Sequence, residues 1–184
     1  MNQMPTSPNR EAAPTRRKAV LWSTAALAAV AGVGAGWWSL GRQSADAGAE
    51  SLWAQRFDTP EGQPLEWSAV RGNGPLLVNF WATWCPPCVA ELPLLDQFGR
   101  EHAAKGWRVL GLAVDQPSSV RKFLSTRHVA FPVGMAGLQG TDLSRSLGNQ
   151  QGSLPFTVVL AANGRVLHRK IGQVTEAELK SWAS

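Results

Sequence analysis

Hydrophobic residues dominate one long uncharged run near the start of the 184-residue chain and form several short runs after residue 50. The short runs are bounded by Gly, Pro or Asn, which predicts buried strands. Such strands are expected at 76–81 and 107–115, with a third strand at 156–161 that turns into a fourth at 165–171. Helical spacing of apolar residues predicts helices at 118–127, at 175–182 and from Pro86 onward. Helices alternate with the first strands and a hairpin follows at Asn163-Gly164, so we expect an α/β fold with a mixed sheet flanked by helices.

The long run, 19–40, contains 22 residues without a charge and directly follows Arg16-Arg17-Lys18. As a helix it would extend about 33 Å, enough to cross a bilayer, and the cations predict that its N-terminal side stays cytoplasmic. An uncleaved anchor and an export signal cleaved near residue 49, at Ala47-Gly48-Ala49, are both open interpretations. Either one places the remaining chain outside the cytoplasmic membrane.

The predicted organisation is therefore a basic leader at 1–18, a transmembrane or signal segment at 19–40, a linker at 41–51 and a globular domain at 52–184. Within the domain, alternation at 53–57 predicts an entry strand and 58–62 a turn.

Net charge excludes one class of partner. The chain carries +5, yet 13 of its 18 basic and 12 of its 13 acidic residues lie beyond residue 44, which leaves a net +1 there. Because no positive field covers the domain, we expect no nucleic-acid partner.

Cys85 and Cys88 are the only cysteines, two residues apart in Trp84-Cys85-Pro86-Pro87-Cys88. A pair at this spacing can close into a disulfide and reopen without rebuilding the fold. A purely structural disulfide is the alternative in an oxidising compartment, but a loop this short adds little stability. The pair therefore predicts a thiol–disulfide oxidoreductase.

The position of Cys85 indicates which thiol attacks and which resolves. Cys85 follows a buried strand and precedes a helix whose first turn tolerates Pro86 and Pro87. The positive end of the helix favours the thiolate, so Cys85 is the expected nucleophile. Cys88, one turn further on, is the expected resolving thiol. Glu91 shares its helix face and, if burial raises its pKa, can accept or return the proton of Cys88. The alternative is a carboxylate that merely favours an early helical turn.

No metal or cofactor is expected. The three histidines are scattered singly, without ligand spacing, and no dinucleotide-binding glycine fingerprint or flavin motif is present. Electrons must then come from another protein by dithiol exchange.

The segment Leu77–Cys88, the following Glu91-Leu92-Pro93, and Leu154-Pro155-Phe156-Thr157 together resemble the thioredoxin superfamily, and in particular its membrane-tethered TlpA/ResA kind. The resemblance covers roughly 52–184 and implies a thioredoxin-like fold. It implies that Pro155 is a cis-proline facing the dithiol and that the backbone of Leu154 pairs with substrate. It also places Trp84 and Pro86 on the docking surface, whereas plain packing explains Trp81.

The function expected from the residues and the resemblance together is an exported, membrane-anchored protein disulfide reductase. Its partners would be oxidised proteins, with apocytochrome c as a natural client, and an upstream membrane thiol reductant. Two alternatives stay open: a disulfide oxidase or isomerase that uses the same residues, and a metal-handling or assembly factor that uses the thiolates as soft ligands.

Overall fold

The strands form one five-stranded sheet in the computed structural model, which describes residues 49–184. The strands are β1 (Leu76–Trp81), β2 (Arg108–Ala113), β3 (Val133–Met135), β4 (Phe156–Leu160) and β5 (Val166–Ile171). Their order across the sheet is β3-β2-β1-β4-β5. β1, β2 and β3 run parallel, whereas β4 is antiparallel to both of its neighbours, β1 and β5. The predicted mixed sheet is therefore confirmed, with the apolar β1 at its centre.

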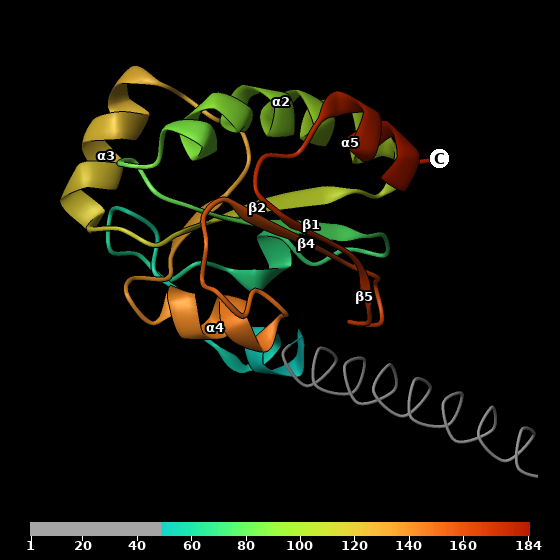
Figure 1. Ribbon diagram of the computed structural model, residues 1–184, viewed down its shortest axis with the longest axis horizontal. Helices are drawn as coiled ribbons and strands as arrows, with labels where there is room; N and C mark the ends of the chain where they lie inside the picture. The colour runs from blue at the N-terminus through green and yellow to red at the C-terminus, as the bar shows by residue number, and fades with distance from the viewer. Residues whose placement is uncertain (1–48) are drawn as a thin grey trace, which may run out of the picture. The chain divides into compact units, whose positions relative to one another are not determined.

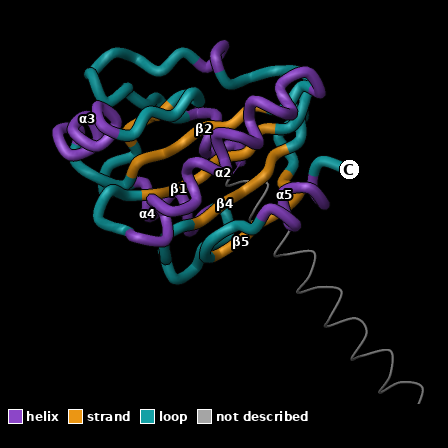
Figure 2. The backbone as a smooth tube through the Cα atoms, turned by 90° about the horizontal axis from the view of Figure 1, so that it is seen from above, coloured by secondary structure: helices purple, strands orange, loops and turns teal. Residues whose placement is uncertain are grey.

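Alternation along β1 divides the core into two layers. Leu77 and Trp81 face one layer, and Val78 and Phe80 face the other. The first layer is covered by α2 (Pro86–His102), α3 (Pro117–Thr126) and α5 (Glu176–Trp182), and the second by α4 (Gly140–Ser146) and the helical residues 49–54. Figure 1 shows these helices above and below the sheet, and Figure 2 looks down on the face that α2 crosses. Helices on both faces were expected and are confirmed.

Four short elements were not predicted, and one prediction was wrong. Short 3-10 helices lie at Trp67–Ala69 and Ala103–Lys105, and β3 and α4 are three and seven residues long, too short to leave a periodic pattern. The predicted strand at 53–57 is not formed, because residues 49–54 are helical. That helix turns Ala49 and Leu52, three residues apart, into the second core layer. Five alternating residues were too few to distinguish the two periods.

The predicted leader, membrane or signal segment and most of the linker fall in residues 1–48, outside the described part of the chain. Within residues 49–184, no helix has the length and apolar character needed to cross a membrane.

Candidate active site

The two cysteines lie at the junction between the end of β1 and the start of α2. Cys85 is the N-cap residue of α2, with Pro86 and Pro87 in the first turn, as predicted. A disulfide joins Cys85 to Cys88. The side chain of Cys88 is fully buried, and Cys85 is 5% exposed. The residue that precedes the pair, Trp84, is 66% exposed. Cys85 is therefore the member of the pair that solvent and a partner reach more readily.

The loop before Cys85 is held by Asp115, which follows β2. One carboxylate oxygen of Asp115 accepts hydrogen bonds from the backbone N–H of Thr83 (2.8 Å) and from its hydroxyl (2.6 Å). The other oxygen accepts from the N–H of Gln116 at 2.7 Å. Sequence reasoning missed Asp115, although its place at the carboxyl end of a predicted strand next to β1 was the available signal. The hydrogen bonds of Asp115 fix the backbone that carries Trp84 and Cys85.

Glu91 of α2 is buried on the side of the helix that faces the sheet, and 1% of its surface is exposed. Its Oε1 accepts from Asn79 Nδ2 at 2.7 Å, and its Oε2 accepts from the backbone N–H of Val174 at 2.8 Å. Burial raises the pKa of Glu91, and the hydrogen bonds from Val174 and Asn79 lower it in part. The condition set for a proton-carrying role, a pKa raised by burial, is met. Glu91 lies three residues after Cys88 on α2.

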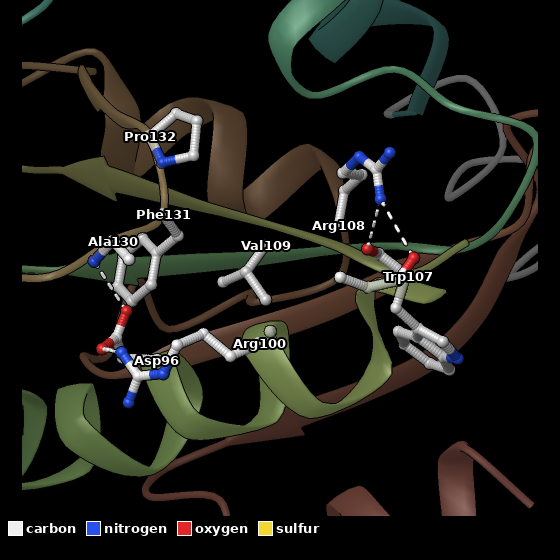
Figure 3. Close-up of a pocket in the computed structure, with 10 residues that line it drawn as sticks. Asp96, Arg100, Trp107, Arg108, Val109, Ala130, Phe131 and Pro132 are labelled. Atoms are coloured by element: carbon white, nitrogen blue, oxygen red, sulfur yellow. Dashed lines mark hydrogen bonds and ion pairs between the residues drawn. The ribbon is translucent and has the colours of Figure 1, made fainter. Parts of the chain in front are cut away.

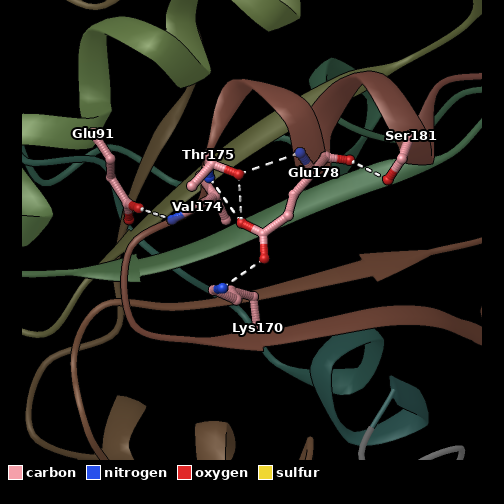
Figure 4. A network of polar contacts seen from close by, with 6 residues as sticks. All are labelled: Glu91, Lys170, Val174, Thr175, Glu178 and Ser181. Atoms are coloured by element: carbon pink, nitrogen blue, oxygen red, sulfur yellow. Dashed lines mark hydrogen bonds and ion pairs between the residues drawn. The ribbon is translucent and has the colours of Figure 1, made fainter.

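The N–H that reaches Glu91 is held in place by the start of α5 (Figure 4). Thr175 and Glu178 form a capping box: Thr175 Oγ1 accepts from the N–H of Glu178, and the Glu178 carboxylate accepts from the N–H of Thr175 at 2.9 Å. The other oxygen of Glu178 pairs with Lys170 Nζ of β5 at 2.5 Å. The helix end, and with it Val174, is thereby tied to the sheet.

Leu154 and Trp84, both assigned to substrate docking by the resemblance, line one cavity of about 640 Å³. The Leu154–Pro155 peptide bond is cis, as the resemblance implied. The chain just before it is clamped by Asn149, whose side chain donates to Ser153 O at 2.8 Å and accepts from Ser153 N at 3.2 Å. Pro155 is buried and Pro86 is exposed. Asn149 carried no recognisable sequence signal.

A second cavity, of about 350 Å³, lies between α2 and residues 130–132 and is not lined by either cysteine (Figure 3). Asp96 lies at its edge, where it pairs with Arg100 and accepts from the N–H of Ala130 at 2.6 Å. These contacts attach the 130–132 segment to α2. Within residues 49–184 no group of three or more His, Cys, Asp or Glu side chains is placed to hold a metal ion.

Sequence comparison assigns the domain to a family. The sequence profile of the Redoxin family matches residues 49–182. The chain belongs to the Redoxin family. It is 30% identical to the thiol-disulfide oxidoreductase ResA of Bacillus cereus, over 66% of this chain and 68% of that protein. It is 31% identical to ResA of Geobacillus kaustophilus, over 65% and 67%.

Solved structures agree with this assignment. A thioredoxin-related protein from Neisseria meningitidis serogroup B superimposes with a TM-score of 0.59 at 26% identity, over 70% of this chain and 96% of that one. StoA from Bacillus subtilis superimposes with a TM-score of 0.56 at 22% identity, over 71% and 96%, which shows the shared fold. The expected thioredoxin-like fold and TlpA/ResA kinship are confirmed. With the disulfide between Cys85 and Cys88, the predicted class, a thiol–disulfide oxidoreductase, is confirmed as well.

Proposed function

We propose that this oxidoreductase works as an exported protein disulfide reductase. The observation that carries the proposal is that α2 holds both Cys85, at its start, and the buried carboxyl group of Glu91, one turn beyond Cys88. In the reduced enzyme the Cys85 thiolate attacks a disulfide of the client and forms a mixed disulfide. Cys88 then attacks Cys85, which releases the reduced client and leaves the Cys85–Cys88 disulfide.

Glu91 handles the proton of the second step. Cys88 is fully buried, so its thiol proton has no direct route to solvent. A carboxyl group on the same helix face, with a pKa raised by burial, can take that proton as Cys88 becomes the nucleophile and supply a proton to Cys88 when the pair is reduced again. The burial of Glu91 on the helix face of Cys88 therefore supports the proposal that the protein reduces its clients with transfer of a proton.

The docking surface is assigned to Trp84, Pro86, Leu154 and Pro155. Trp84 offers an exposed indole beside Cys85, and it shares a cavity with Leu154. Aromatic side chains with little conformational freedom suit such a surface. An extended client segment that pairs with the backbone of Leu154 would bring its disulfide toward Cys85.

The partners proposed are oxidised proteins on the outer side of the membrane, with apocytochrome c as one client, and an upstream membrane thiol reductant that regenerates the dithiol. The segment 19–40 supports a location at the membrane, with the domain outside. Export with cleavage near residue 49 would give a free domain with the same chemistry.

Two measurements test the direction of exchange. Equilibration of the full-length protein with a dithiothreitol or glutathione series gives the reduction potential of the pair. A value near or below that of thioredoxin, about −270 mV, supports reduction, and a value toward about −120 mV overturns it in favour of disulfide formation. The Cys88→Ser variant should trap the client as a mixed disulfide on Cys85, whereas the matched Cys85→Ser variant should trap none.

A further inference from the structure

Three buried side chains form a polar cluster under α2: Asn79 of β1, Thr157 of β4 and Glu91 of α2. Asn79 and Thr157 are direct cross-strand partners in the β1–β4 register. The exposed fractions of Asn79, Thr157 and Glu91 are 0%, 0% and 1%, so no solvent replaces a missing hydrogen bond there. The Asn79 amide, at the centre of the cluster, has no part in the chemistry described so far.

The hydrogen bonds of this cluster suit a charged Glu91. Asn79 Nδ2 donates to Glu91 Oε1 at 2.7 Å and to Thr157 Oγ1 at 3.0 Å, and the N–H of Val174 donates to Glu91 Oε2 at 2.8 Å. Both carboxylate oxygens thus receive a donor. The Asn79 Oδ1, in contrast, is buried and has no hydrogen-bond partner among residues 49–184. A strong acceptor without a donor is the unexplained feature of the site.

A protonated Glu91 needs a different partner. Its O–H must donate, but the two groups that now face its oxygens are themselves donors. The N–H of Val174 belongs to the backbone and cannot turn around. The amide of Asn79 can, because a half-turn about its last side-chain bond exchanges Nδ2 and Oδ1, two atoms of similar size.

We propose that Asn79 is a positioning residue that supports both protonation states of Glu91: its Nδ2–H donates to the carboxylate, and after a half-turn its Oδ1 accepts the O–H of the carboxylic acid. This inference rests on the proton-carrying role proposed for Glu91. It extends that role to a residue that acts through its hydrogen bond to Glu91.

The remaining contacts of Asn79 allow the half-turn. Thr157 Oγ1 now accepts from Nδ2, and since a hydroxyl is both donor and acceptor, it can donate to Oδ1 after the exchange. One amide atom lacks a partner in either orientation, so the number of unsatisfied buried groups stays the same. Val174 keeps its bond to Glu91 Oε2 throughout. The two orientations are therefore close in energy, and the proton on Glu91 decides between them.

The chemical step balances as follows. The Sγ–H bond of Cys88 breaks and its proton goes to Glu91. The Cys88 Sγ–Cys85 Sγ bond forms while the bond between Cys85 and the client sulfur breaks, and the client sulfur leaves with the electron pair. The two cysteines are oxidised and the client is reduced. Asn79 turns as Glu91 receives the proton and turns back when Glu91 releases it. The structure, which has the Cys85–Cys88 disulfide and Asn79 Nδ2 donating to Glu91, corresponds to the oxidised protein after that release.

Few other charges act on this cluster. β1 and β4 carry no titratable side chain in the described strands. On α2, Cys88 lies three residues before Glu91. From β5 and α5 come Lys170 and Glu178, which pair with each other, and His168, which stacks on a ring of α5. No ion pair to Glu91 is formed among residues 49–184, so the amide is its main side-chain partner.

The test is a pH titration of the oxidised full-length protein in detergent, followed by NMR of ¹³C-labelled Glu carboxyl groups and ¹⁵N-labelled Asn side chains. The side-chain NH₂ signals of Asn79 should change with the same midpoint as the carboxyl carbon of Glu91. Asn149 is an internal control, because its NH₂ bonds to Ser144 and Ser153 instead and should not follow this midpoint. Asn79 signals that stay constant while Glu91 titrates would overturn the inference. This measurement needs no variant.

Asn79→Leu separates two-way support from donation alone. If Asn79 served only as a hydrogen-bond donor to the Glu91 carboxylate, its replacement would raise the pH midpoint of the Glu91 titration by about one unit. That shift is a tenfold gain in proton affinity. Support of both states predicts a shift well below tenfold, because each form loses one partner. Thr157→Val is the matched control: it removes a hydroxyl without touching Glu91, and the signals of Asn79 and Glu91 should still change together. A tenfold or larger shift in Asn79→Leu contradicts two-way support.

Failure of the proposed reductase function and failure of the inference about the Asn79 amide give different results. A potential near −120 mV, with Asn79 and Glu91 titrating together, would refute the reductase and leave the amide's response intact. A low potential and a trapped client on Cys88→Ser, with unresponsive Asn79 signals, would refute the inference alone.

Discussion

Removal of the Asp115 carboxylate should loosen the loop that carries Trp84 and Cys85. Asp115→Ala deletes two hydrogen bonds to Thr83, at 2.8 Å to the N–H and 2.6 Å to the hydroxyl. Hydrogen bonds to charged groups each contribute about 1.5–3 kcal/mol when buried. Asp115 is only half-buried, so water replaces part of this, and we expect the free energy of unfolding to fall by about 2–3 kcal/mol.

A double-mutant cycle isolates the contact. Thr83→Val keeps the side-chain shape and removes only the hydroxyl bond, for an expected loss of about 1 kcal/mol. Because Thr83→Val and Asp115→Ala remove the same hydroxyl bond, the double variant should be about 1 kcal/mol more stable than the sum of the two losses predicts. Urea unfolding of the oxidised protein, followed by tryptophan fluorescence, measures all four proteins.

Strict additivity of the two losses would refute the reasoning, because it would mean that Asp115 and the Thr83 hydroxyl do not interact. A functional readout accompanies the cycle. If Asp115 positions Cys85, its loss should also slow the reaction of the reduced protein with a small disulfide reagent, and Thr83→Val should slow that reaction less.

Three further outcomes are expected. Burial raises the pKa of Glu91, so its contribution to stability is fully present below the unfolded pKa of about 4.5 and is lost as pH rises through the folded pKa. Urea unfolding at pH 5 and pH 7 should therefore show a smaller loss with rising pH in Glu91→Gln than in the wild type, and an equal loss would contradict the burial effect. Thr175→Ala breaks the capping box with Glu178 and should lower the free energy of unfolding by about 1 kcal/mol, whereas no change would show that the cap is idle. Gly74→Ala would place a Cβ 2.5 Å from the carbonyl oxygen of Gly106, and thermal unfolding should report a loss of about 1–3 kcal/mol unless the backbone yields freely.

The strands and helices that the sequence predicted well are those with a continuous apolar run or a sustained helical period. The runs at 76–81 and 156–161 correspond to β1 and β4, which are buried along their whole length, and the spacing after Pro86 corresponds to α2. Burial imposes both patterns, so they are visible without coordinates. Where the element is short, as in β3, or where five residues fit two periods, as at 53–57, the local pattern was insufficient.

The candidate site divides in the same way. Cys85, Cys88 and Glu91 lie within one short segment, so helical geometry alone relates them. Asp115, Asn149 and Val174 hold the site from distant parts of the chain, and no local rule assigns a hydrogen bond between residues separated by 32 or 83 positions.

The sequence by itself determined that the chain carries a redox dithiol at a strand-to-helix junction, within a mixed α/β domain. Those properties follow from local covalent spacing and from the periods that burial requires. Only the tertiary structure decided the surroundings of Glu91: its burial, its bond to Asn79 across the α2–β1 contact and its bond to the Val174 N–H before α5. These depend on how separate elements pack, because desolvation and hydrogen bonding act through space and not along the chain.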